Sequence, residues 1–145
     1  MTIAIVNGPN MNLIGRREPE IYGTQPLDDY LNELESRYPE VHFMRFQSNH
    51  EGALIDYLQQ VGFDNSVSAI ILNAAAYTHT SLALADTIAA IPTPVVEVHI
   101  SNPKRRKPAL RRTSLLSPVV VASFAGFGLR SYQIAVDFIC ESYNE

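Results

Sequence analysis

The chain of 145 residues is 46% hydrophobic and 18% charged, the balance of one globular domain spanning residues 1–145. Its formal net charge of −4 argues against a protein that coats nucleic acid. A lone cysteine, Cys140, excludes an internal disulfide framework and a cysteine-based zinc cluster. The sequence shows no apolar stretch of membrane-spanning length and no signal peptide. We therefore expect a soluble cytoplasmic protein that binds neither nucleic acid nor membrane.

Apolar runs typical of strands alternate with helix-like stretches along the chain. The strand candidates are residues 3–6, 41–46, 68–72, 94–99 and 119–121. The helix candidates are residues 27–38, 51–61, 81–90 and 129–142, and the first two repeat apolar residues with helical spacing. Runs that are buried on both faces indicate a parallel sheet, and right-handed crossovers leave few topologies. We predict a flavodoxin-like, doubly wound sheet with strand order 2-1-3-4-5 and helices on both faces.

Polar side chains gather after three of these runs. In open parallel sheets, ligands bind beyond the carboxyl ends of the strands, near the point where strand order reverses. Asn10 follows the first run, residues 73–81 follow the third, and residues 97–102 end the fourth. Because these runs are neighbours in the predicted sheet, we expect one crevice to hold all three clusters.

Several of these polar residues also fit structural roles. We interpret Asn7 as a turn residue. Thr78, Thr80 or Ser81 is expected to cap the third helix. His79 fits an exposed helix start as well as it fits a functional position.

Glu97 and His99 stand one residue apart on the fourth strand candidate, so their side chains point to the same face. A carboxylate inside an otherwise apolar strand is unfavourable unless it is paired. We therefore interpret this pair as part of a functional site.

The segment from residue 15 to 24 lacks helix and strand periodicity and carries Tyr22 close to Arg16 and Arg17. Tyrosine titrates near pH 10, so a tyrosine base needs about 4 kcal/mol of stabilisation, which nearby cations supply. Packing of Tyr22 on the sheet rim is the alternative. The run 104–112 holds six of the eleven lysines and arginines and follows the fourth strand candidate. It therefore suits an anionic substrate, although a solvated loop is also consistent with it.

The signatures of several other chemistries are missing from the sequence. It has no dinucleotide glycine fingerprint and no Walker lysine motif, and its four histidines lack metal-ligand spacing. Both lysines lie in the run 104–112, which leaves no buried lysine for a Schiff base.

Four stretches resemble type II 3-dehydroquinate dehydratases: NGPNMNLIGRREPEIYG (7–23), FQSNHEGALID (46–56), ILNAAAYTHTS (71–81) and EVHISN (97–102). They occur in the family's order, and the similarity covers nearly the whole chain. The resemblance implies a flavodoxin-like fold and a cofactor-free lyase without a metal. That lyase dehydrates 3-dehydroquinate to 3-dehydroshikimate by anti elimination through an enolate. It works in the shikimate pathway of aromatic amino acid and chorismate biosynthesis, or in quinate breakdown, as a homododecamer of four trimers.

The resemblance also implies catalytic roles. Tyr22 matches the general base, which acts as a phenolate on the C2 proton, and Arg17 matches the arginine that stabilises this phenolate. Asn10 matches the residue that positions a water molecule at the enolate. His99 matches the general acid that protonates the departing C1 hydroxyl, and Glu97 would set the state of its imidazole.

A second set of residues matches the family's substrate-binding positions. This set is Asn73, His79, Asp86, Ile100, Ser101, Arg106 and Arg111. Within it, the backbone N–H groups of Ile100 and Ser101 would receive the substrate carboxylate. Asp86 matches a residue that reaches the site of a neighbouring subunit.

The run 104–112 departs from the family pattern. Arg106 is followed by Lys107 where the family usually has an acid, and Ser114 lies one residue further on than usual. Arg105 therefore stands as an alternative to Arg106, and Arg112 as an alternative to Arg111. In addition, Ala75 replaces a commoner glycine.

Other functions compete with the lyase. The altered run is compatible with a family member of impaired activity. A non-enzymatic flavodoxin-like module that binds an anion or FMN would use the loop after the first strand. A nucleic-acid-binding protein would use the run 104–112 and would show strongly salt-dependent binding.

Overall fold

The computed structural model describes residues 1–143. Its strands are β1 (Thr2–Asn7), β2 (His42–Gln47), β3 (Ala69–Asn73), β4 (Val95–His99) and β5 (Ala122–Ala125). Its α-helices are α1 (Pro19–Tyr22), α2 (Leu27–Arg37), α3 (Glu51–Gly62), α4 (Leu82–Ala90) and α5 (Arg130–Ser142). Short 3₁₀ helices lie at Met11–Leu13, Ala75–His79, Pro103–Arg105, Ala109–Arg112 and Ser117–Val119.

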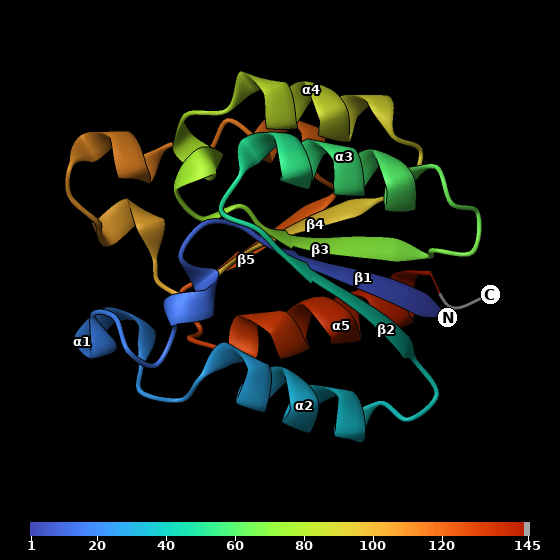
Figure 1. Ribbon diagram of the computed structural model, residues 1–145, viewed down its shortest axis with the longest axis horizontal. Helices are drawn as coiled ribbons and strands as arrows, with labels where there is room; N and C mark the ends of the chain where they lie inside the picture. The colour runs from blue at the N-terminus through green and yellow to red at the C-terminus, as the bar shows by residue number, and fades with distance from the viewer. Residues whose placement is uncertain (144–145) are drawn as a thin grey trace.

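The elements form three layers, with the sheet between two pairs of helices (Figure 1). Helices α3 and α4 cover one face of the sheet, and α2 and α5 cover the other (Figure 1). All neighbouring strands are parallel and follow the order β2-β1-β3-β4-β5. This order confirms the predicted flavodoxin-like topology.

Strand β1 shows why its sequence is continuously apolar. Ile3 and Ile5 pack into the core on the side of α2 and α5, whereas Ala4 and Val6 pack into the core on the side of α3 and α4. All four side chains are fully buried. A central parallel strand must contribute to both cores, so its sequence cannot alternate between apolar and polar residues.

The helix candidates agree with the structure to within a residue or two at each end. Ser81 is the residue that caps α4, since its Oγ accepts a hydrogen bond of 2.9 Å from the backbone N–H of Leu84. This contact decides among the three capping residues that the sequence allowed. Within residues 1–143, no helix combines the length and the apolar character that a membrane crossing requires.

The fifth strand is displaced from its predicted position. The sequence favoured residues 119–121, but Val119 ends a 3₁₀ helix and Val121 is half exposed. Strand β5 follows at Ala122–Ala125 and pairs only with β4, at the edge of the sheet. An edge strand is solvated on one side, so it tolerates Ser123 and does not need an apolar run.

One further expectation was wrong, and one short helix was not predicted. Asn7 is not a turn residue but the buried last residue of β1, beside Asn73 in the register of β1 and β3. The hydroxyl of Tyr132 satisfies both amides, because it donates to Asn7 Oδ1 and accepts from Asn73 Nδ2 at 3.1 Å. The segment 15–24 also contains the helix α1, which is only four residues long and too short to show periodicity.

Gly8 joins β1 to the loops at the carboxyl ends of the strands. Its backbone N–H donates to the carbonyl of Asn73 at 2.7 Å, which holds the ends of β1 and β3 together. A Cβ at this position would lie 2.6 Å from the backbone carbonyl oxygen of Ala74. Backbone atoms cannot move aside as a flexible side chain can, so only glycine fits between the two strand ends.

Gly8→Ala is therefore expected to lower the free energy of unfolding by about 1–3 kcal/mol, the usual effect of an overpacked site. Urea denaturation of the purified variant measures this change. Gly52→Ala is the matched control, because a Cβ on this α3 residue meets nothing within 4 Å. It should leave stability unchanged or raise it by up to about 1 kcal/mol. Equal stability of the two variants would contradict the close approach at Gly8.

Candidate active site

A pocket of about 110 Å³ opens beyond the carboxyl ends of β1, β3 and β4. The segments with α1 and the two 3₁₀ helices of residues 103–112 project from this end of the sheet (Figure 1). Ten residues singled out from the sequence line the pocket: Asn10, Arg17, Tyr22, Asn73, His79, His99, Ile100, Ser101, Arg106 and Arg111. The expected convergence of the polar clusters is therefore present.

Two of the singled-out residues do not line this pocket. Glu97 is buried behind His99 and contacts it from β4. Asp86 is exposed on α4 and is not part of the pocket wall of its own chain.

Two guanidinium groups lie close to the ring of Tyr22. The Cζ atoms of Arg17 and Arg106 are 5.5 and 5.4 Å from the centre of its ring. Arg106 Nη1 also donates hydrogen bonds to Tyr22 Oη at 2.9 Å and to Ser101 Oγ at 3.1 Å. Negative charge on the Tyr22 oxygen would therefore be stabilised by two nearby cations.

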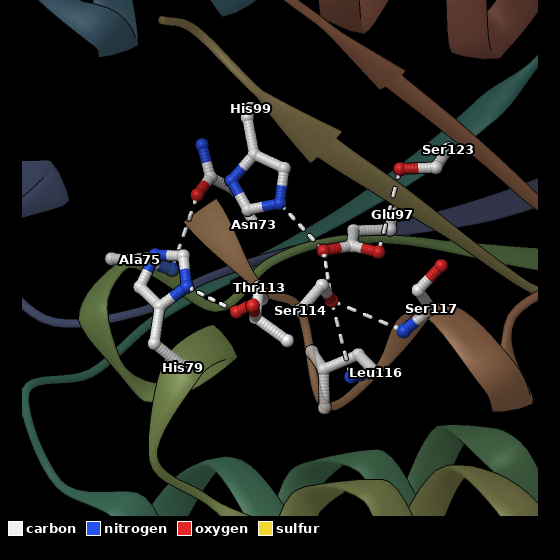
Figure 2. Close-up of polar contacts among 10 residues, drawn as sticks. All are labelled: Asn73, Ala75, His79, Glu97, His99, Thr113, Ser114, Leu116, Ser117 and Ser123. Atoms are coloured by element: carbon white, nitrogen blue, oxygen red, sulfur yellow. Dashed lines mark hydrogen bonds and ion pairs between the residues drawn. The ribbon is translucent and has the colours of Figure 1, made fainter. Parts of the chain in front are cut away.

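His99 ends β4 and is paired with Glu97 (Figure 2). Its Nε2 lies 2.6 Å from Glu97 Oε1. The same carboxyl group accepts hydrogen bonds from Ser114 Oγ at 2.7 Å and from Ser123 Oγ at 3.4 Å. Glu97 is thus buried inside the sheet with every hydrogen-bonding partner supplied by side chains.

The pKa of Glu97 results from opposing influences. Burial, the largest single influence, raises it, while the hydrogen bond and charge of His99 and the hydroxyls of Ser114 and Ser123 lower it. Together the partners outweigh burial, so the pKa of Glu97 lies below its ordinary value. Glu97 is therefore a carboxylate at neutral pH, and His99 Nε2 donates the hydrogen bond between them.

The second imidazole of the pocket is fixed by the backbone. His79 Nδ1 lies 2.7 Å from the carbonyl oxygen of Thr113, to which it must donate because a carbonyl only accepts (Figure 2). The rings of His79 and His99 are 6.4 Å apart and inclined by 21°. In both imidazoles, one ring nitrogen is thus hydrogen-bonded to another group of the protein.

The two asparagines of the pocket are held in different ways. Asn10 has a left-handed backbone, with φ of 66°, and its N–H donates to Asn49 Oδ1 at 3.0 Å. Asn73 accepts from the backbone N–H of Ala75 at 3.2 Å through Oδ1 and donates to Tyr132 through Nδ2. Because Nδ2 carries two hydrogens, Asn73 still has one to offer to a ligand.

The basic run separates into residues at the pocket and residues away from it. Arg106 and Arg111 line the pocket, whereas Arg105 is exposed outside it. Arg112 donates through Nε to the carbonyl of Arg106 at 3.1 Å, so it supports the loop. Of the alternatives that the sequence left open, the structure thus places Arg106 and Arg111 at the pocket.

Sequence reasoning missed the roles of four residues that hold this site: Asn49, Ser114, Ser123 and Tyr132. Each contacts a site residue that is distant in the sequence, so no local pattern revealed it. Ser123 is opposite Glu97 in the register of β4 and β5, a relation that requires the strand pairing to be known. Within residues 1–143, no group of three His, Cys, Asp or Glu side chains is arranged to hold a metal ion.

A doubly wound parallel sheet with a tyrosine, a carboxylate-paired histidine and several guanidinium groups at its carboxyl end defines a flavodoxin-like protein with an acid–base site. The chain belongs to the class II dehydroquinase family, whose model matches residues 1–140.

Several relatives cover nearly the whole chain. A 3-dehydroquinate dehydratase of an Exiguobacterium species is 49% identical, over 99% of this chain and 97% of its own. One of Roseiflexus castenholzii is 45% identical, over 96% of this chain and 88% of its own. The crystal structure of the type II dehydroquinase of Butyrivibrio crossotus superposes with a TM-score of 0.90 at 37% identity. That match covers 96% of this chain and 97% of the other.

The lowered pKa of Glu97 predicts how its contribution to stability depends on pH. A carboxyl group whose folded pKa is depressed stabilises the fold above its unfolded value, 4.5 for glutamate, and loses this effect as pH falls through the folded pKa. Wild type should therefore be more stable than Glu97→Gln at pH 7, and the difference should shrink below about pH 4.5. Denaturation curves of both proteins between pH 3.5 and 7 measure it. A difference that is constant with pH would show that folding leaves the pKa of Glu97 unshifted, and a difference that grows as pH falls would show that its pKa is raised.

Proposed function

We propose that this chain is a hydro-lyase that converts 3-dehydroquinate into 3-dehydroshikimate in the cytoplasm, as a step of the shikimate pathway. Membership of the class II dehydroquinase family supports the substrate. The observation that carries the mechanism is the geometry of a single pocket. Tyr22 lies there close to two guanidinium groups, and the Nε2 of His99 lies there 2.6 Å from a buried carboxylate.

Tyr22 acts as the base and His99 as the acid. The Tyr22 phenolate takes the proton from C2, next to the ketone, and the electrons of the C–H bond form an enolate. The enolate then collapses, the bond from C1 to its hydroxyl oxygen breaks, and His99 gives that oxygen a proton so that it leaves as water. The elimination is anti, because the base and the acid approach opposite faces of the substrate.

The other pocket residues bind substrate and stabilise charge. Arg17 and Arg106 stabilise the phenolate, and Asn10 positions a water molecule at the enolate oxygen. The N–H groups of Ile100 and Ser101 receive the carboxylate. Hydroxyl groups of the ring are bound by a set of four side chains: Asn73, His79, Ser101 and Arg111.

The altered run 104–112 does not favour the alternative of an impaired family member. Arg106 and Arg111 both line the pocket despite the departures from the family pattern. The reaction needs no cofactor, because the ketone of the substrate itself accepts the electrons.

The central prediction is turnover of 3-dehydroquinate by the purified protein, followed by the ultraviolet absorbance of the conjugated enone product. Tyr22→Phe should lower kcat by about 10²–10⁴-fold, the usual contribution of a general base. Tyr57→Phe is the matched control, because Tyr57 stacks on Phe46 away from the pocket and phenylalanine keeps that stacking. Added borohydride should have no effect, because no imine forms. A folded wild-type protein without turnover would exclude this function.

The second prediction concerns assembly into a homododecamer of four trimers, in which Asp86 reaches a neighbouring site. Sedimentation is expected to give twelve times the chain mass of 16.1 kDa. Asp86 does not line the pocket of its own chain, so in the proposed assembly it acts on the site of another copy. Asp86→Asn and Tyr22→Phe chains that are unfolded and reassembled together should recover turnover that neither variant has alone. A monomer, or a mixture without recovered turnover, would contradict this arrangement.

A further inference from the structure

Ser114 connects the buried carboxylate of Glu97 on β4 to the polypeptide backbone (Figure 2). Its Oγ accepts hydrogen bonds from the backbone N–H groups of Leu116 and Ser117, each at 3.1 Å. The same oxygen lies 2.7 Å from Glu97 Oε1. A serine hydroxyl has one hydrogen and two lone pairs. The two N–H groups occupy the lone pairs, so the hydrogen of Ser114 points to Glu97.

The direction of each hydrogen bond in this series, from the backbone to His99, is therefore determined. Two backbone N–H groups, which do not titrate, donate to Ser114, and Ser114 donates to Glu97. A donor aimed at a buried carboxyl group favours its ionised form. The ionised Glu97 accepts in turn from His99 Nε2, which lies 2.6 Å away. His99 Nδ1 is left as the nitrogen that does not contact Glu97.

We propose that Ser114 is a positioning residue of the reaction: it holds Glu97 as an acceptor, so that His99 keeps its Nε2 proton and delivers the proton on Nδ1. This inference rests on the proposed function. In the step concerned, the Nδ1–H bond of the imidazolium breaks as the proton joins the departing hydroxyl oxygen. The imidazole that remains is neutral and still carries its Nε2 proton.

The neighbouring residue strengthens this assignment. The carbonyl of Thr113 orients His79 while the side chain of Ser114 orients the partner of His99. The dipeptide Thr113–Ser114 thus contacts one pocket imidazole, His79, and the carboxylate partner of the other, His99. It begins two residues after Arg111, which lines the same pocket. Movement of the basic run would change the orientation of both imidazoles together.

The electrostatic surroundings of Glu97 are defined by the cavity behind His99. Four other titratable or charged groups line this cavity: His79, His99, Lys104 and Arg112. Glu97 is the one acid among the described residues that line it. Ser114 and Ser123 are the hydroxyl donors to its carboxylate.

The test is the kinetics of Ser114→Ala, with Ser114→Thr as the variant that restores the hydroxyl and Ser123→Ala as the matched control. Loss of a hydrogen bond to a charged group should lower kcat about tenfold in Ser114→Ala and shift the acid limb of its pH profile up by about one unit. KM should change by less than about twofold, since substrate contacts remain. Ser114→Thr should recover most of the activity. Ser123→Ala should lose less than about threefold, because its bond of 3.4 Å is weak.

A double-mutant cycle shows whether Ser114 acts through Glu97. In the Glu97→Gln background, Ser114→Ala should cost less than about twofold and move no limb of the pH profile. An equal loss in both backgrounds, or a loss confined to KM, would overturn the proposal. Ser114 would then support the conformation of the basic run and not act through Glu97.

Solid-state ¹⁵N NMR of histidine-labelled protein tests the proton position without turnover, and His99→Gln identifies the signal. Neutral His99 should carry its proton on Nε2 in wild type. A proton on Nδ1 would overturn the proposal even in an active enzyme. Absence of turnover in wild type, with the Nε2 proton present, would instead refute the proposed function and leave the hydrogen-bond assignment standing.

Discussion

The structure of the site depends on one buried carboxylate. Glu97 occupies a buried strand whose other residues, apart from His99, are valines, and an unpaired charge there would cost several kcal/mol. The surrounding elements supply its partners: His99 from the same strand, Ser123 from the edge strand and Ser114 from the segment before it. This one group therefore links the edge strand, the segment before it and an imidazole of the pocket.

The two sides of the pocket are built on different supports. His99 and Asn73 are the last residues of β4 and β3, in which every residue is buried, so their positions are as rigid as the sheet. Tyr22 ends a helix of four residues and is only partly buried. Its oxygen is held by Arg106 of the basic run. The geometry of His99, the proposed acid, thus comes from the core, whereas the geometry of Tyr22, the proposed base, comes from contacts between two loops.

The sequence predicted the central strands and the long helices because their burial imposes a regular pattern. Prediction failed where burial is incomplete or the element is short, as at β5 and α1. Asn7 was misassigned because its partner, Tyr132, is far away in the chain, and local preference for turns then dominated the interpretation. The pocket itself was predictable, since parallel strands bring their carboxyl ends to one edge. The pairing of Glu97 with His99 was predictable from their spacing on one strand. The contacts of Glu97 with Ser114 and Ser123 were not, because they depend on how segments that are distant in the sequence pack together.

The uneven distribution of charge has a consequence for how fast an anion reaches the pocket. Six of the eleven lysines and arginines lie in residues 104–112, beside the opening of an otherwise acidic molecule. A field of this shape attracts anions toward the opening and repels them from the remaining surface. Encounter should therefore become slower as ionic strength rises and the Debye length contracts to about 8 Å at physiological salt. The rate of the chemical step in the bound complex, which is shielded inside the pocket, should be much less sensitive to salt.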